Sequence, residues 1–344
     1  MTQYNPQTPE EFLAALAASG GNLRRFLEDR LLRPLNDEAQ REAGEAAVRE
    51  ALHELLDVNL EDFQSGLESV HGAFEAAGTK HITDAEGEVV DEGAAAFFDI
   101  DNTLVQGASV VVFAMGLYRH KFFTIREMIP VMWKQLRFRA TGNENVEDAK
   151  YARDQGLAFV KGRTVEEVYA LCDDIVESKM VEKIWPGTKA LAESHIKAGQ
   201  QVWLVSATPV QLGQILAKRL GFTGALGTVG EVKDGKFTGR LVGDILHGPG
   251  KKHAVAALAA IEGLDLSRCT AYSDSVNDVP MLSMVGRAVA INPDRKLRKY
   301  AERMGWQVHD FRSVRKAVRS FGMPTIITAA ISLGGWGTWK MFNR

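Results

Sequence analysis

Short apolar runs that end in polar residues alternate along this chain with segments whose apolar residues recur at helical spacing. The runs at 94–98, 201–205, 271–273, 288–291 and 306–309 are typical of strands. Around Asp234-Gly235, polar and apolar residues flank a tight-turn pair, which predicts a β-hairpin over 231–239. Between 107 and about 184 the helical pattern returns, so we expect a helical insertion directly after the first run.

The first 90 residues have their own pattern. Segments such as 10–18 and 42–56 carry apolar residues at helical spacing among many charges, and a polar, acidic linker follows at 83–93. This region offers no clustered catalytic residues. We therefore expect a helical accessory or dimerisation module rather than a second active site.

Composition bounds the rest of the picture. A chain of 344 residues that is 45% hydrophobic can bury a large core and predicts more than one domain. The formal charge is 41 − 44 = −3, so charge gives no reason to expect a nucleic-acid partner. The two cysteines, Cys172 and Cys269, are far apart and lack metal-ligand spacing, which indicates reduced core residues of a cytoplasmic protein. The polar first residues predict no secretory signal.

Two carboxylates one residue apart follow the first apolar run. If 94–98 is a buried strand, Asp99 stands at its carboxyl end, where open parallel sheets place their ligands, and Asp101 can face the same site. Unpaired buried carboxylates are costly, so a cation is expected beside them. Taken alone, an acidic turn that caps the next helix through Asn102 or Thr103 would give the same pattern.

A hydroxyl residue ends the second run. Ser206, with the exposed amides that follow it, is a candidate donor to phosphate oxygens. The alternative is an N-cap before a helix that starts at Pro209.

The Gly-rich turn 248–250 delivers Lys251 just before an Ala-rich helical stretch at 254–261. Lys251 can neutralise a phosphate or a carboxylate, or it can be a solvated residue at a helix start. A nucleotide-binding P-loop is excluded, because the pattern needs glycine at Ile245 and serine or threonine at Lys252.

The last motif is an acidic loop after the run at 271–273. Asp274 and Asp278 supply hard oxygen ligands of the kind that suits magnesium, although each can also be an ordinary loop or cap residue.

In this order, Asp-x-Asp-x-Thr, Ser, Lys and Ser-Asp-x-x-Asn-Asp resemble the motifs of the haloacid dehalogenase (HAD) superfamily of phosphatases, in the branch that contains phosphoserine phosphatase. The resemblance covers about 94–311. It implies an α/β, HAD-like Rossmannoid parallel sheet with a helical C1-type cap inserted after the first motif, in addition to the helical N-terminal region. The implied domains are an accessory region at 1–90, a catalytic core at 91–106 and 185–311, a cap at 107–184 and a basic, apolar tail at 312–344.

The same resemblance implies the residue roles. Asp99 would be the nucleophile and Asp101 the general acid and then base of a magnesium-dependent phosphomonoester hydrolase that forms an aspartyl-phosphate. Mg²⁺ would be held by Asp99, the backbone carbonyl of Asp101 and Asp274. The remaining roles are phosphate binding by Ser206, Ala207 and Lys251, and support by Thr103, Asn277 and Asp278.

The substrate is left open by two departures. Phosphoserine phosphatase carries a glutamate nine residues after its nucleophile, and this chain has Ala108 there. The arginine that would read a substrate carboxylate has only nearby candidates, Arg153 and Arg163. Losing a charged partner removes much of a substrate's recognition. We expect either a phosphoserine-like small molecule or a lipid phosphate such as a lysophospholipid phosphate, and transfer of the phosphoryl group to an alcohol is a third option.

Two segments raise the question of membrane contact. The cap interleaves aromatic and basic residues, which form either core and solvated face or a surface for anionic lipid. The uncharged stretch 324–339 has Trp336 and Trp339 near its cationic end. It predicts either a membrane-associated tail on the cytoplasmic face or a tail that packs on the protein or stays mobile. The competing hypothesis is a non-catalytic scaffold that keeps the fold and recruits partners through its helical N-terminal region and apolar tail. A homodimer is a further expectation.

Overall fold

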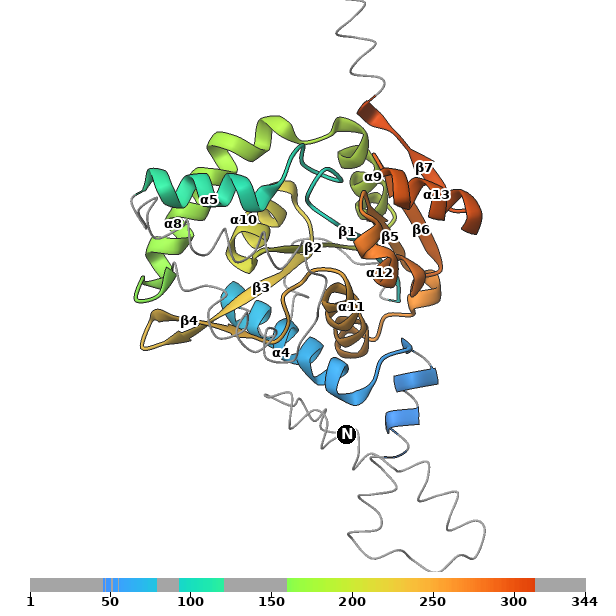
Figure 1. Cartoon of the computed structure of the whole chain (residues 1–344), viewed down its shortest axis with the longest axis horizontal. Helices are drawn as coiled ribbons and strands as arrows, with labels where there is room; N and C mark the ends of the chain where they lie inside the picture. The colour runs from blue at the N-terminus through green and yellow to red at the C-terminus, as the bar shows by residue number, and fades with distance from the viewer. Residues whose placement is uncertain are drawn as a thin grey trace, which may run out of the picture.

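Strand β1, which precedes Asp99, lies at the centre of a seven-stranded sheet in the computed structural model of the protein (Figure 1). The structure describes residues 56–78, 93–120 and 160–312, together with positions 46, 48–50 and 52–54. The sheet order is β4-β3-β2-β1-β5-β6-β7, and only the β3–β4 pair is antiparallel. The strands are β1 (Ala95–Phe98), β2 (Gln201–Pro209), β3 (Gly224–Lys233), β4 (Lys236–Val242), β5 (Thr270–Ser273), β6 (Arg287–Ile291) and β7 (Gln307–His309).

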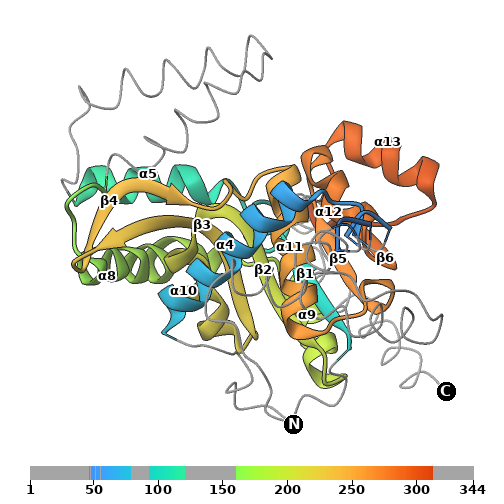
Figure 2. The ribbon, with the colours of Figure 1, turned by 90° about the horizontal axis from the view of Figure 1, so that it is seen from below.

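Helices cover both faces of this sheet (Figures 1 and 2). The α-helices in the described residues are α4 (Leu60–Ala77), α5 (Ser109–Arg119), α8 (Val165–Ile175), α9 (Pro186–Lys197), α10 (Val210–Leu220), α11 (Pro249–Glu262), α12 (Val279–Ser283) and α13 (Arg295–Met304). Short 3₁₀ or π turns lie at Val176–Met180, Val181–Lys183, Leu266–Arg268 and Val276–Asp278. The predicted α/β parallel-sheet fold is confirmed.

Side-chain alternation along β1 divides the core into two halves. Ala95 and Phe97 pack into a cluster with residues of α4, α11, α12 and α13, whereas Ala96 and Phe98 pack into a cluster with α5, α8, α9 and α10. The period of two in a strand places successive side chains on opposite faces. Because both faces are buried, β1 reads as a continuous apolar run.

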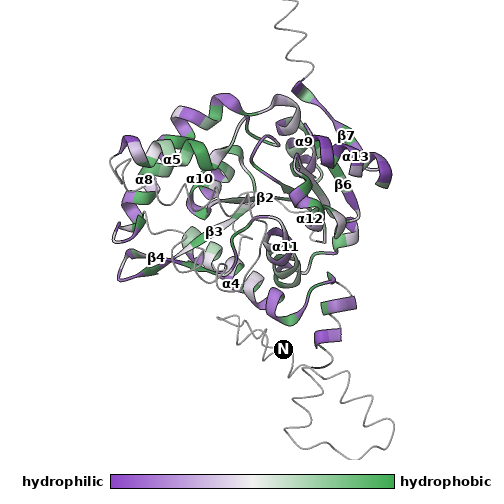
Figure 3. Ribbon diagram, in the orientation of Figure 1, coloured by the Kyte–Doolittle hydropathy of each residue, from purple (hydrophilic) through white to green (hydrophobic). Residues whose placement is uncertain are grey.

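Local signals fix several helix ends. Thr164 and Glu167 form a capping box at the start of α8. Asp294 accepts hydrogen bonds from the first turn of α13, and Gly305, at φ 70°, ends that helix. Figure 3 shows that α13 is mostly hydrophilic, as expected for a helix that buries a narrow stripe.

Helix α4 packs onto the sheet and onto α11, which the sequence did not indicate. Its buried residues, among them Phe63, Leu67, Val70 and Phe74, belong to the same core cluster as Phe97 of β1. In the sequence, 60–77 falls within the predicted accessory region at 1–90, separate from the predicted catalytic core. The structure shows that this helix shares the core of the sheet, while the limits of the accessory region stay a prediction.

Two linkers join the cap to the core and pair with each other. Trp185 N donates to Leu104 O at 2.8 Å, and Gln106 N donates to Lys183 O at 2.9 Å. The described part of the cap consists of α5, α8 and the turns after α8. Residues 121–159, including Arg153, lie outside the described residues, whereas Arg163 is described and forms an ion pair with Glu167.

The predicted hairpin is confirmed as β3–β4, with Asp234 and Gly235 both at positive φ in its turn. Strand β2 spans Gln201–Pro209, so it continues beyond Ser206, the hydroxyl residue expected at its end. Cys172 and Cys269 are buried free cysteines, as predicted.

The prediction that the C-terminal tail contacts a membrane stays a prediction, because residues 313–344 lie outside the described residues. Within the described ranges, the helices are too short or too polar to cross a bilayer.

Candidate active site

Lys251 joins two carboxylates that come from different strand ends. Its Nζ donates hydrogen bonds to Asp99 Oδ1 at 2.6 Å and to Asp278 Oδ2 at 2.7 Å. Asp99 directly follows β1, and Asp278 lies in the short turn after β5. The three side chains are only 3–6% exposed. The cation that the sequence required beside its buried carboxylates is therefore Lys251.

The Gly-rich turn before α11 sets the position of Lys251. Gly248 has φ 56°, a left-handed conformation that favours glycine, and Pro249 starts the helix. A Cβ at Gly250 would lie 2.3 Å from the carbonyl oxygen of Ile245. Only a residue without a side chain allows the turn to close this tightly. The turn places Lys251 within hydrogen-bond distance of Asp99 and Asp278, which follow β1 and β5.

The electrostatics of the cluster are dominated by carboxylates. Burial raises the pKa of Asp99 well above its ordinary value, and Lys251 opposes that rise. Three further carboxylates add to it, those of Asp278, Asp101 and Asp274. Burial lowers the pKa of Lys251, but Asp99 and Asp278 raise it by more, so the ammonium stays protonated. One ammonium thus faces several carboxylates, and a second cation would stabilise their ionised forms.

Asp274 follows β5 and is half-buried. Burial first, and then the charge of Asp278, raises its pKa to about 7, while a hydrogen bond from the Asn102 side chain opposes the rise. Asn102 has φ 54° and is held by Asn292, whose Nδ2 donates to Asn102 O at 3.0 Å. From the sequence, Asn102 was predicted only as a possible helix cap, and Asn292 was not predicted. The available signal was that Asn292 directly follows the strand at 288–291, just as Asp99 and Asp274 follow their strands.

Asp101 is held by the first residue of the cap helix α5. Its Oδ1 accepts a hydrogen bond from Ser109 N at 2.8 Å and another from Ser109 Oγ. Ser109 is buried, and the carboxylate lies at the positive end of the α5 dipole. Sequence reasoning missed Ser109. The available signal was Gly107, whose φ of 95° turns the chain back toward Asp101.

Ser206 is buried in β2, one strand away from Asp99. Its Oγ accepts hydrogen bonds from Thr208 N at 3.3 Å and Thr208 Oγ1 at 3.0 Å. The β2–β3 register shifts between Val205 and Pro209, so Ser206 and Ala207 stand where the ladder is irregular. Helix α10 has Pro209 at its N-cap without a side-chain cap bond, so the alternative of Ser206 as its N-cap is wrong.

Thr103 and Asn277 were expected to support the site. Thr103 is fully buried, its carbonyl accepts from Thr188 Oγ1 at 2.7 Å, and its own Oγ1 has no hydrogen-bond partner among the described residues. Asn277 is exposed, and its backbone N donates to Ser275 Oγ at 3.2 Å. Their supporting roles stay predictions.

The donor set fits a hard divalent cation. Within the described ranges, the side chains do not form a preassembled group of three or more metal-ligating residues. Carboxylate and carbonyl oxygens are nevertheless the ligands that magnesium takes, and it keeps several waters. The charges of Asp101 and Asp274 both raise the pKa of Asp99. The surplus of negative charge is the observation that favours a cation here.

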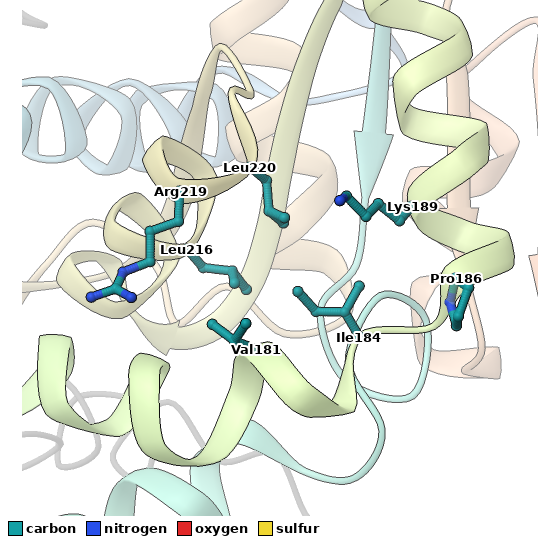
Figure 4. Close-up of a pocket in the computed structure, with 7 residues that line it drawn as sticks. All are labelled: Val181, Ile184, Pro186, Lys189, Leu216, Arg219 and Leu220. Carbon is teal, nitrogen blue, oxygen red and sulfur yellow. The ribbon is translucent and has the colours of Figure 1, made fainter.

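Figure 4 shows a surface cavity, whose volume is about 360 Å³. Its lining is mostly apolar and comes from the cap–core junction, α9 and α10: Val181, Ile184, Pro186, Lys189, Leu216, Arg219 and Leu220. Arg219 on its rim is already paired with Asp173 and Glu177. None of the predicted site residues lines this cavity.

Comparison with known proteins agrees with this geometry. The model of the haloacid dehalogenase-like hydrolase family matches residues 96–283, more than half of the chain. A protein of Mycobacterium tuberculosis (strain ATCC 25618 / H37Rv) named "Phosphoserine phosphatase SerB1" is 54% identical over 248 residues, which cover 72% of this chain and 79% of that protein. The "Inhibition of morphological differentiation protein" of Streptomyces azureus is 36% identical over 236 residues, 67% of this chain and 84% of that protein.

Among solved structures, a protein of unknown function from Bordetella pertussis Tohama I superposes with a TM-score of 0.56 at 30% identity. The match covers 63% of this chain and 98% of that one. The predicted family, and with it the prediction that the chain is an enzyme, is confirmed. The chain belongs to the haloacid dehalogenase-like hydrolases.

Proposed function

We propose that this protein is a magnesium-dependent phosphomonoester phosphatase that works through an aspartyl-phosphate on Asp99. The observation that carries the proposal is the buried hydrogen bond from Lys251 Nζ to Asp99 Oδ1 at 2.6 Å. A buried carboxylate at a strand end beside an ammonium is suited to attack an anionic phosphorus centre, because the ammonium offsets the charge that both reactants bring.

Asp99 and Asp101 divide the chemistry between them. In the first step a carboxylate oxygen of Asp99 bonds to phosphorus, the ester P–O bond breaks, and Asp101 gives its proton to the departing alkoxide. In the second step Asp101 takes a proton from water, the water oxygen bonds to phosphorus, and the bond to Asp99 breaks. The products are an alcohol and inorganic phosphate.

The remaining residues hold the phosphoryl group. Lys251 Nζ, the Ser206 hydroxyl and the backbone N–H of Ala207 are the proposed donors to its oxygens. Asp99, Asp274 and the carbonyl of Asp101 would hold magnesium, which when bound supplies positive charge to the phosphoryl oxygens. Asp278 keeps Lys251 in place through their 2.7 Å hydrogen bond.

The proposed substrate is a small phosphomonoester of the phosphoserine type, because the relative named for that activity is 54% identical. Ala108, the N-cap of α5, offers no side-chain hydrogen bond at the position discussed above. The lipid-phosphate alternative depended on the tail at 312–344 and gains no support from the described residues. Membrane contact, a homodimer and a scaffold role likewise gain none.

The proposal is tested by incubating the purified protein and Mg²⁺ with phosphoserine, sugar phosphates and lysophospholipid phosphates. We expect phosphate release from at least one small phosphomonoester. With a substrate that carries labelled phosphate, acid quenching should trap the label on the wild-type protein and not on Asp99→Asn. Turnover by Asp99→Asn at the wild-type rate would refute the nucleophile assignment.

A further inference from the structure

Helix α4 precedes the residues matched by the family model, yet it contacts the chain on both sides of Lys251. We infer that α4 is a positioning element of the active site, in which Gly66 and Ser69 fix the segments that flank Lys251. The effect of α4 on catalysis rests on the proposed function. The contacts of α4 are independent of that function.

The first contact is between Gly66 and the residue two positions after Lys251. A Cβ at position 66 would lie 2.2 Å from the carbonyl oxygen of His253 and 3.2 Å from Ala254 N. These are backbone atoms of α11, which cannot swing aside as a side-chain end can. The two helices touch here through their backbones, so the position of α11 is set directly by α4.

The second contact is with the loop before Lys251. Ser69 is buried, and its Oγ accepts a hydrogen bond from Asp244 N at 2.9 Å while donating to Ser65 O at 3.0 Å. A Cβ at Gly243, which has φ 66°, would lie 2.2 Å from Ser69 Oγ. The loop that leads into the Gly-rich turn therefore packs against α4, and this contact is as close as the contact between α11 and α4.

Polar contacts of His253 and Lys252 connect these segments. His253 Nδ1 lies 2.8 Å from Asp244 Oδ2, which joins the loop to α11, and His253 Nε2 lies 3.5 Å from Asp62 Oδ2 in the first turn of α4. Lys252 Nζ donates to Asp57 O at 2.6 Å and to its Oδ2 at 2.7 Å, just before α4 begins.

Lys251 thus stands between two segments that α4 holds, and its Nζ meets Asp99 and Asp278 at 2.6 and 2.7 Å. A buried ammonium in two hydrogen bonds this short tolerates little displacement of its backbone. Misplacement of a catalytic group by about 1 Å costs about a hundredfold in rate. The helix can therefore control catalysis without touching the substrate.

The test compares two glycines on α4. Gly66→Ala pushes the helix away from α11, whereas Gly72→Ala meets a side-chain methyl of Val229 on β3, at 2.7 Å, and serves as the matched control. Hydrogen exchange of the backbone amides at 244–255, read by mass spectrometry on the full chain, needs no catalytic activity. We expect faster exchange there in Gly66→Ala than in Gly72→Ala. Equal exchange in both would overturn the inference.

The kinetic arm asks whether α4 acts through Lys251. We expect Gly66→Ala to lower kcat by about tenfold to a hundredfold with a smaller change in KM. In a Lys251→Arg background the same substitution should cost much less, because the group that it misplaces is already misplaced. Equal fold losses in both backgrounds would show a merely structural role.

Ser69→Ala is the second variant, for use if Gly66→Ala does not fold. It removes the acceptor for Asp244 N without adding bulk, and we expect the same pattern with a smaller loss of kcat. If the wild-type protein releases phosphate from no substrate, the proposed function fails, and the exchange comparison still decides the positioning role.

Discussion

Ser109 donates two hydrogen bonds to Asp101 Oδ1, one from its backbone N–H at 2.8 Å and one from its hydroxyl. Because Ser109 is the first residue of α5, the proposed general acid and base is attached to the cap. With both donors on Oδ1, the proton that Asp101 transfers in the proposed mechanism is carried by its other oxygen, Oδ2. In the proposed mechanism, acid–base catalysis therefore depends on the position of α5.

Ser109→Ala should lower kcat/KM by about tenfold, a part of what general acid catalysis supplies. The loss should be larger for an alkyl phosphate than for p-nitrophenyl phosphate, whose leaving group needs less protonation. Ser109→Thr, which keeps the hydroxyl, should recover most of the rate. Equal losses with both substrates would contradict a role through Asp101.

Lys251→Met should destabilise the fold as well as stop turnover. It leaves the buried carboxylates of Asp99 and Asp278 without their ammonium, and removing one partner of a buried ion pair typically costs about 3–5 kcal/mol. The neighbouring Lys252→Met is the control, because its partner Asp57 is 82% exposed and so does not become a buried unpaired charge when the ammonium is removed. Urea unfolding curves would measure both. A similar loss in the two variants would count against the buried cluster.

The metal-free protein should lose stability as the pH rises from about 4 to about 7. The pKa of Asp274 is 3.8 in its ordinary state and about 7 in the fold, so the folded state binds the proton more tightly. The stabilisation from this proton is complete at low pH and disappears as the pH passes through the folded pKa. Melting temperatures in EDTA should show the decline, and Asp274→Asn should flatten it. A decline of the same size in Asp274→Asn would assign it to other groups.

Chelation should stop phosphate release, and added Mg²⁺ should restore it. Mg²⁺ should also raise the melting temperature of the wild-type protein at pH 8 and leave that of Asp274→Asn nearly unchanged, since a ligand stabilises only the state that binds it. Full turnover by a metal-stripped preparation would refute the proposed magnesium site.

Local patterns in the sequence were sufficient for the fold class and for most of the candidate site. A buried strand needs a continuous apolar run, and a polar residue after that run must stand at the edge of the sheet. This reasoning located Asp99 and Asp274 without coordinates, and the Gly-rich turn at 248–250 separately indicated Lys251. The turn at Asp234-Gly235 was equally local, because its positive φ values are a property of the two residues themselves.

The tertiary structure alone decided which of these groups meet. Lys251 pairs with Asp278 as well as with Asp99, and Ser109 donates to Asp101. Helix α4 lies against α11 in the core. Each contact joins residues from different elements of the fold. Periodicity reports which face of a helix is buried but not which neighbour buries it. Helix α4 therefore resembled an independent module in the sequence, and only packing against the sheet and the backbone of His253 placed it beside Lys251.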